Sequence, residues 1–199
     1  MNMKRIYRHF IASILAVFAL PSYVYAEPQT LTLDNQHTYV LWKVKHLGFS
    51  TQAGKWYASG QLVLDKDNPQ QGKVNVTIKV DDIVTGIPEL DKHLKGKLFF
   101  DTKQFPTATF VSNRVEVMGK NKAKVYGMLT LHGVTKPIIL NVILNKAGIN
   151  LLNDRETAGF SATTSLKRSD YGIKALIPEV GDDVEIEIEA EAYLDKKYG

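Results

Sequence analysis

The residues of this sequence with the greatest capacity for chemistry are its histidines and one short block that begins with an arginine. Beyond residue 26 the histidines stand at positions 37, 46, 93 and 132. No two of them have the H-x-H or H-E-x-x-H spacing that brings two imidazoles to one metal ion. The sequence therefore predicts no metal site, and lone histidines of this kind are more often structural residues than ligands.

The sequence also shows no motif of a nucleophilic catalytic site, in which a serine or cysteine is held against a base. The chain has no cysteine, and no Gly-x-Ser-x-Gly elbow places a serine on a sharp strand-to-helix turn. One enzymatic alternative is left. In it, Arg168 binds an anion while His46 or His93 acts as the general base.

Arg168 begins the block Arg168-Ser169-Asp170-Tyr171-Gly172, directly after an alternating apolar run over residues 160–166. Its planar guanidinium could bind a phosphate or a carboxylate through two parallel hydrogen bonds at the rim of a cavity. A structural role is also open, because Arg168 could instead pair with Asp170 or with the backbone and fix the turn.

The N-terminal residues have the pattern of an export signal. Lys4, Arg5 and Arg8 precede an apolar stretch of 11 residues, 10–20, which is too short to span a bilayer as a helix. Residues 24–26 (Val-Tyr-Ala) then fit a signal-peptidase site. We therefore expect residues 1–26 to be a cleaved signal peptide and residues 27–199 to form one periplasmic domain.

Composition limits the partners of that domain. The chain has 25 basic and 21 acidic residues, and without the three basic residues of the signal the numbers are 22 and 21. Balanced charge gives no long-range attraction to nucleic acid, so we exclude that class of partner. Without cysteine there are neither disulfides nor thiolate metal ligands, and the fold must depend on packing.

Alternation of apolar and polar residues dominates the rest of the chain, as expected for strands with one buried face. Val184, Ile186 and Ile188 show it most clearly, because glutamates separate them. Eight such runs predict an all-β antiparallel fold: residues 38–46, 56–64, 74–80, 108–112, 125–131, 138–144, 160–166 and 184–190. This count fits a β-sandwich as well as a closed barrel.

Residues 88–96 break the alternation. Pro88 suits a helix start, acidic residues follow it, basic residues come last, and Gly96 suits the C-terminal cap. On a helix, Ile87, Leu90 and Leu94 would share one face. We expect a short helix that covers one end of the sheet.

Residue sizes leave open whether a barrel of this length is filled or hollow. An eight-stranded barrel either fills its interior with side chains or encloses one apolar ligand. Large inward-facing aromatic residues favour filling: Trp42, Trp56, Phe99, Phe100, Phe105, Phe110 and Phe160. Small inward-facing residues favour a cavity: Ala58, Gly60, Ala108, Gly127, Ala158 and Ala162.

An ordered series of blocks resembles the YceI-like family over essentially the whole of residues 27–199. The most characteristic block is VYGMLTLHGVTKP, residues 125–137. The others are residues 37–46 with Gly54, 90–94 followed by 98–101, 105–110, 168–172 and 180–184. The sequence departs from the family at Trp42, where phenylalanine is expected, and at Lys167, where a polar residue is usual.

This resemblance implies an eight-stranded, lipocalin-like antiparallel barrel with a short helix near its mouth and a long apolar lumen. It also implies polyisoprenoid ligands, among them isoprenoid quinones and polyprenyl phosphates. We expect inward-facing residues to contact the lipid chain: Val40, Trp42, Val44, His46, Leu62, Ile78, Leu94, Phe99, Phe110, Leu129, Leu140 and Phe160. Arg168 and His93 are the candidates for contact with the lipid head group.

The function predicted from these observations is a non-catalytic periplasmic carrier of a long-chain isoprenoid lipid or quinone. No catalytic cofactor is expected. The partners expected are the lipid itself and, transiently, the inner-membrane surface or a membrane redox protein. The oligomeric state is left open, with a dimer as one option. One alternative is an envelope enzyme that acts on an amphipathic lipid substrate with Arg168 and His46 or His93 in the roles given above. A third alternative is an interaction module whose barrel is fully packed.

Overall fold

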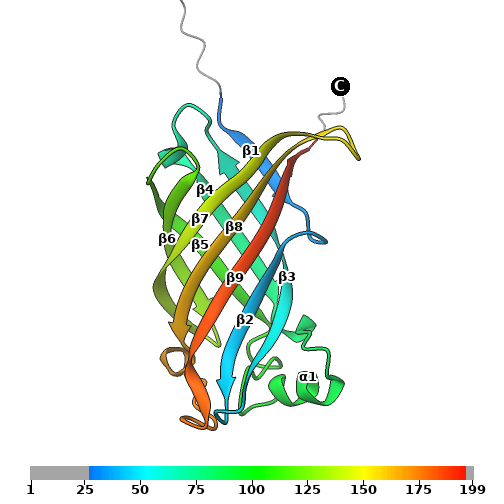
Figure 1. Ribbon diagram of the computed structural model, residues 1–199, viewed down its shortest axis with the longest axis vertical. Helices are drawn as coiled ribbons and strands as arrows, with labels where there is room; N and C mark the ends of the chain where they lie inside the picture. Colours follow the sequence, from blue (N-terminus) through cyan, green and yellow to red (C-terminus); the bar gives the residue numbers. More distant parts are fainter. Residues whose placement is uncertain (1–26, 196–199) are drawn as a thin grey trace, which may run out of the picture.

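The alternating segments form antiparallel strands that close into a barrel (Figure 1). The computed structural model describes residues 27–195, so the predicted signal peptide lies outside the described residues. The strands are β1 (Gln29–Leu33), β2 (Tyr39–His46), β3 (Ser50–Leu64), β4 (Lys73–Lys79), β5 (Thr107–Val117), β6 (Lys122–Leu131), β7 (Val134–Asn150), β8 (Arg155–Lys167) and β9 (Val180–Leu194). The helical segments are α1 (Pro88–Leu94) and three 3-10 turns, η1 (Pro69–Gln71), η2 (Val80–Asp82) and η3 (Arg168–Tyr171).

Pairing between β3 and β4 closes the sheet into a ring. Around the ring the order is β3-β2-β9-β8-β7-β6-β5-β4, and every neighbouring pair is antiparallel. β1 also pairs with β3 and β9, so β1 and β2 together occupy one position of the ring. Nine strands thus make an eight-stranded barrel. This confirms the predicted fold class and excludes a sandwich of two sheets.

β1 is the strand that the alternation did not predict. It has only five residues, and Leu31 and Leu33 are its only fully buried positions. These two leucines are 2% and 6% exposed and pack against Ala158 and Ala192 inside the barrel. Its stability therefore depends on contacts with β8 and β9, which lie far away in the sequence.

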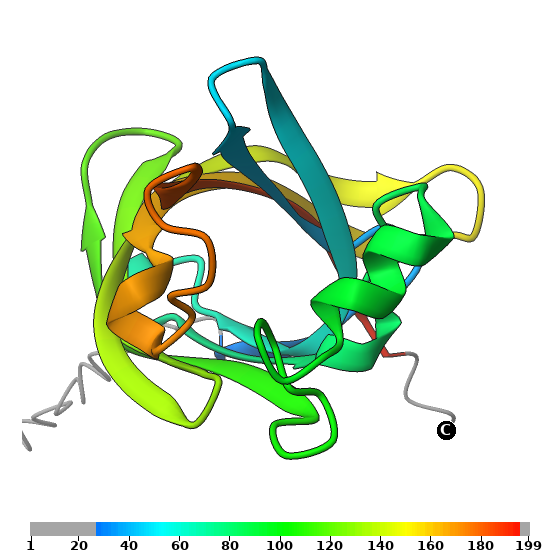
Figure 2. The same ribbon diagram turned by 90° about the horizontal axis from the view of Figure 1, so that it is seen from below.

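The antiparallel order sends the connections to two opposite ends of the barrel (Figure 1). We call one of them the helix end; it carries the connections β2–β3, β4–β5, β6–β7 and β8–β9, and α1 lies within the β4–β5 connection. The other is the hairpin end, with the turns β3–β4, β5–β6 and β7–β8. Seen from the helix end, α1 and the β8–β9 connection lie on opposite sides of the rim (Figure 2).

Helix α1 begins at Pro88, where the missing backbone N–H costs nothing because the first turn leaves it unpaired. A carboxylate oxygen of Asp91 accepts a hydrogen bond from the backbone N–H of Thr85 at 2.8 Å and another from its hydroxyl, which holds the segment before the helix. The helix ends at Leu94, two residues before the end of the predicted segment. No helix within residues 27–195 is long and apolar enough to cross a membrane.

The expected common face of α1 is only partly correct. Leu94 is buried and Leu90 is half-buried against the barrel core, whereas Ile87 is 52% exposed. Ile87 precedes the helix with an extended backbone, φ −124° and ψ 101°, so helical spacing does not apply to it.

Candidate functional site

A cavity of about 510 Å³ lies inside the barrel. Side chains of all nine strands contribute to its wall, and between the two rims the described wall contains aliphatic residues, three aromatic rings and threonine but no charged group. Pockets of about 300–1,000 Å³ are typical of sites that bury a small ligand. This arrangement can surround an apolar chain.

Seven of the twelve predicted lumen residues line this cavity: Val40, Leu62, Ile78, Phe110, Leu129, Leu140 and Phe160. They come from β2 to β8, because alternate residues of each strand face the same side of the sheet. On these seven strands the alternation identified the inward face correctly, whereas β1, whose Leu33 also lines the cavity, was not predicted. Contact with a ligand stays a prediction for each of them.

The small inward residues play two different roles. Ala58, Ala108 and Ala162 line the cavity and leave space in it. Gly127 instead makes room for a ring, because a Cβ there would lie 2.5 Å from Phe110. The expectation that every small residue widens the lumen is therefore wrong for Gly127, and also for Gly60 and Ala158, neither of which lines the cavity.

Below the cavity, at the helix end, the barrel is filled by a cluster that we call the aromatic plug. Its buried members are Trp42, Trp56, Val80, Ile83, Leu94, Phe99, Ala108 and Ile173. The ring centroids of Trp42 and Trp56 are 6.2 Å apart, and Phe100 packs edge-on to Trp56 at 5.1 Å. The structure thus places Trp42, Leu94 and Phe99 in the plug, with Val44 packed against it, and not among the residues that line the cavity.

The two tryptophans of the plug differ in their polar contacts. Trp56 donates its indole N–H to the backbone oxygen of Val80 at 2.9 Å. Trp42 lies so close to Gly54 that a Cβ on that glycine would be 2.4 Å from the ring. Its indole N–H is buried and has no hydrogen-bond partner among the described residues. Trp42 therefore fills space at the cost of an unsatisfied donor.

The histidines of the helix end lie outside the cavity. His46 is the last residue of β2 and pairs with Ser50 across the turn. His93 is exposed on α1 and packs against the ring of Phe99, with centroids 5.0 Å apart. Neither residue lines the cavity, so a role for His46 in the lumen or for His93 at a head group stays a prediction.

Arg168 is 7% exposed, and its guanidinium donates hydrogen bonds to three backbone oxygen atoms. Nε donates to Gly181 at 2.8 Å, Nη1 to Ile173 at 3.1 Å and Nη2 to Val180 at 2.8 Å. Asp170 pairs with Lys136 instead, at 3.0 Å. Of the interpretations left open by the sequence, these contacts favour a backbone tie that fixes the β8–β9 connection. An anionic head group at Arg168 would have to displace these carbonyl oxygens.

The positive charges of Lys167 and Arg168 lie close to the negative charge of Asp182. Burial lowers the pKa of Arg168, and the charge of Asp182 partly offsets this effect. Burial alone would raise the pKa of Asp182, but hydrogen bonds from the backbone N–H and hydroxyl of Ser169 lower it, as do the charges of Lys167 and Arg168. The group as a whole holds η3 against the start of β9.

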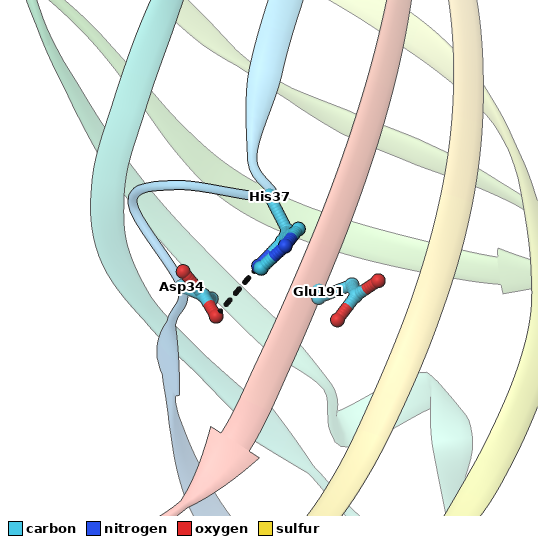
Figure 3. Close-up of side chains that lie close together, drawn as sticks. All are labelled: Asp34, His37 and Glu191. Carbon is cyan, nitrogen blue, oxygen red and sulfur yellow. Dashed lines mark hydrogen bonds and ion pairs between the residues drawn. The ribbon is translucent and has the colours of Figure 1, made fainter. Parts of the chain in front are cut away.

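A second cluster of polar side chains lies at the break between β1 and β2 (Figure 3). Asp34 and His37 belong to the β1–β2 turn and Glu191 to β9, and their ligand atoms lie within 4.8 Å of one another. His37 Nδ1 contacts Asp34 at 3.0 Å, and His37 is largely exposed. The hydrogen bond that His37 donates to the Asp34 carboxylate raises the pKa of His37, as do the charges of Asp34 and Glu191. An ion pair that anchors the turn accounts for this geometry.

The residues that the sequence reasoning missed lie at the hairpin end. There the cavity wall includes the charged residues Lys66, Lys73, Lys120, Lys122 and Asp65. No pattern in the sequence singles them out, because nothing in a turn sequence reveals that the turn borders a lumen.

Comparison with known proteins gives a consistent result. The sequence profile of a family described as "YceI-like domain" matches residues 31–192. A UPF0312 protein of Pseudomonas putida (strain W619) is 39% identical over 142 residues, which cover 71% of this chain and 73% of that protein. A UPF0312 protein of Photorhabdus laumondii is 36% identical over 167 residues, which cover 83% of this chain and 86% of that protein.

Solved structures share the architecture. BcnA of Burkholderia cenocepacia has a TM-score of 0.72 and 26% identity, covering 80% of this chain and 98% of that one. The YCEI protein of Campylobacter jejuni has a TM-score of 0.67 and 30% identity, with 76% and 90% covered. A polyisoprenoid binding domain from Saccharophagus degradans has a TM-score of 0.66, with 85% and 100% covered, and its 14% identity shows the fold alone.

Proposed function

Because this chain belongs to the YceI-like domain family, we propose that it is a non-catalytic carrier that holds a long-chain isoprenoid lipid in its barrel. The lipid we propose is an isoprenoid quinone or a polyprenyl phosphate, and the compartment is the periplasm. The observation that carries the proposal is the cavity of about 510 Å³, whose wall inside the barrel is uncharged over the described residues. The fold shared with a polyisoprenoid binding domain supports the ligand class.

Energetics favour reversible carriage. Burial is worth about 0.8 kcal/mol per CH₂ group, so one five-carbon isoprene unit gains up to about 4 kcal/mol on leaving water. About eight units would nominally exceed the ceiling of roughly 18–21 kcal/mol for non-covalent complexes, and ordering of the chain offsets part of this gain. The interior of a bilayer is equally apolar. Exchange between cavity and membrane therefore changes the free energy little, and a carrier can load and unload.

The position of the acid–base groups favours the carrier over the enzymatic alternative. Within residues 27–195 no histidine lines the cavity. His46 and His93 lie at the helix end, on the far side of the plug, and the guanidinium of Arg168 is held by backbone oxygens. A general base needs to reach its proton directly or through one water molecule.

Native mass spectrometry of protein purified from the periplasm, followed by organic extraction, tests the proposal. We expect an isoprenoid lipid to be bound without being added, on a chain whose first residue is Glu27. A chain that retains residues 1–26, or one that carries no lipid and binds none when supplied, would contradict the compartment or the carrier role respectively.

A matched pair of variants shows whether the lipid lies in the lumen. Ala162 is buried on the cavity wall, whereas its neighbour Thr163 is exposed on the outer face of β8. Ala162→Phe should reduce bound lipid about tenfold, with an overpacking cost of about 1–3 kcal/mol, and Thr163→Phe should not reduce it. Equal loading of both folded variants, checked by circular dichroism, would place the lipid elsewhere. Gly127 is unsuitable for this test because its Cβ would collide with Phe110.

A further inference from the structure

The cavity reaches the surface of the protein at the hairpin end. Most residues of its wall are buried or half-buried, and the exposed ones all belong to the three hairpin-end turns or the strand ends beside them. They are Lys66, Pro69, Lys73, Val117, Gly119, Lys120, Asn121, Lys122 and Ala147. At the opposite end the aromatic plug closes the barrel. The hairpin end is therefore the open end of the lumen.

Charge in the cavity wall is confined to this same rim. Four lysines lie there against one carboxylate, Asp65, among the described lining residues. Asp65 is 6% exposed and accepts hydrogen bonds from the backbone N–H groups of Asp67 at 2.9 Å and Asn68 at 2.7 Å. The carboxylate of Asp65 is thus directed at backbone N–H groups, where it stabilises the β3–β4 turn.

The lysines of the rim are not equally engaged. Lys66 forms an ion pair with Glu156. Lys73, at the start of β4, has no ion-pair partner within residues 27–195, and the same is true of Lys120 in the β5–β6 turn and Lys122 at the start of β6. Lys73, Lys120 and Lys122 thus border the mouth of an uncharged lumen on the side formed by β4, β5 and β6, and none of them has an ion-pair partner within residues 27–195.

The β3–β4 and β5–β6 turns, which lie beside or contain these lysines, are held in place by contacts with neighbouring strands. η1, in the β3–β4 turn, packs against β5, and the backbone N–H of Leu144 donates to Asn121 at 2.8 Å. Lysine side chains keep their ammonium groups in water while their stems lie along apolar surface. They bind phosphate as flexible point charges, which suits an exposed rim.

We propose that Lys73, Lys120 and Lys122 bind the phosphate or diphosphate head group of an isoprenoid lipid that is inserted tail first from the hairpin end. This inference rests on the carrier function proposed above and moves the head group away from Arg168 and His93. The lipid chain lies in the lumen with its far end toward the plug, and its anionic group stays at the rim. The site thereby favours polyprenyl phosphates over neutral lipids of the same chain length.

The test compares polyprenyl phosphate with the polyprenol of equal chain length by equilibrium binding. Wild-type protein should bind the phosphate about tenfold more tightly at low salt, and high salt should reduce this preference because exposed charges are screened. The triple variant Lys73→Gln/Lys120→Gln/Lys122→Gln should lose the preference and keep its affinity for polyprenol. The matched control is Lys92→Gln/Lys97→Gln/Lys103→Gln, three exposed lysines of the helix end, which should keep both.

Three outcomes separate the alternatives. Equal binding of the two lipids by wild-type protein, or a preference that survives in the rim variant, overturns the lysine site while the carrier function stands. Failure of wild-type protein to bind either lipid overturns the carrier function itself. Inorganic phosphate is the third probe: if it binds as tightly as polyprenyl phosphate, the lysines form a site for free anions and the assignment to a lipid head group is wrong.

Discussion

The two halves of the barrel interior are both apolar, yet one is hollow and the other is solid. Strands supply inward side chains to both halves at the same spacing. The difference comes from the connections, since five of the eight buried plug residues lie outside the strands: Val80, Ile83, Leu94, Phe99 and Ile173. The hairpin-end turns contribute no residue to the three buried clusters. The helix end of the barrel is therefore blocked mainly by residues of the connections, and not by residues of the strands.

The largest expected effect is a difference in the free energy of unfolding between a variant in the plug and a variant in the cavity wall. Trp56→Ala removes a buried indole together with its hydrogen bond to Val80, so unfolding should become easier by about 3–5 kcal/mol. Leu129→Ala shortens a half-buried side chain that packs against the Phe110–Leu140–Ala162 cluster but also faces the cavity, so it should cost less, about 1–2 kcal/mol. Urea unfolding measures both values. Equal losses would mean that the hollow half is packed as tightly as the plug.

A smaller effect concerns the tie that holds the helix end together. Arg168→Lys keeps the charge but cannot donate to three carbonyl oxygens in fixed directions, so stability should fall by about 2–3 kcal/mol. The control is Arg114→Lys, an exposed arginine on β5, which should change stability by less than about 1 kcal/mol. Both should bind polyprenyl phosphate and polyprenol in the wild-type ratio. If Arg168→Lys keeps its melting temperature but loses affinity for the phosphate alone, the plug end holds the head group after all.

The smallest effect lies at the border between the halves, where Asp34 and His37 join β1 to β2. The raised pKa of His37 means that its contribution to stability is complete below its ordinary value of 6.5 and is lost as pH rises through the raised value. The lowered pKa of Asp34 adds a loss only at acidic pH, below 3.8. Wild-type protein should therefore melt slightly higher relative to His37→Gln at about pH 5.5 than at about pH 8.5.

The same pH series should leave lipid binding unchanged, because this ion pair lies on the outside of the barrel (Figure 3). A difference in melting temperature between the two proteins that does not depend on pH would show that the imidazole acts through packing alone. Lipid release that follows the titration of His37 would join the outer turn to the lumen and weaken the separation of the two halves.

Alternation along the chain predicted most of this fold because inward and outward positions are a local property of a strand. Seven lumen residues and eight of the nine strands could be identified from it. Pro88 and Gly96 predicted α1 where the alternation stops, and closure into a barrel was implied by the family resemblance alone. β1 escaped prediction because five residues carry too little periodicity. Its role depends on β3 and β9, which no local pattern reveals.

The candidate site was less predictable because it depends on contacts between distant segments. Trp42 and Phe99 have the same apolar character as Phe110, and only the docking of α1 and the β8–β9 connection separates plug from lumen. For Arg168, sequence could supply the planar donor group but not its acceptors, which are backbone atoms of residues 173–181. The rim lysines look like ordinary turn residues until the ring is closed.

The sharing of one barrel position by β1 and β2 also dictates when the protein can fold. Both strands pair with β9, and residues such as Tyr39 and Glu189 that face each other there are about 150 positions apart. Before β9 has emerged, β2 and β8 leave two unpaired sheet edges, which invite association with other chains. Contacts of such long range make folding slow. Closure is therefore a late event that needs nearly the full length of the polypeptide, and chains truncated within β9 should aggregate before they can acquire a lumen.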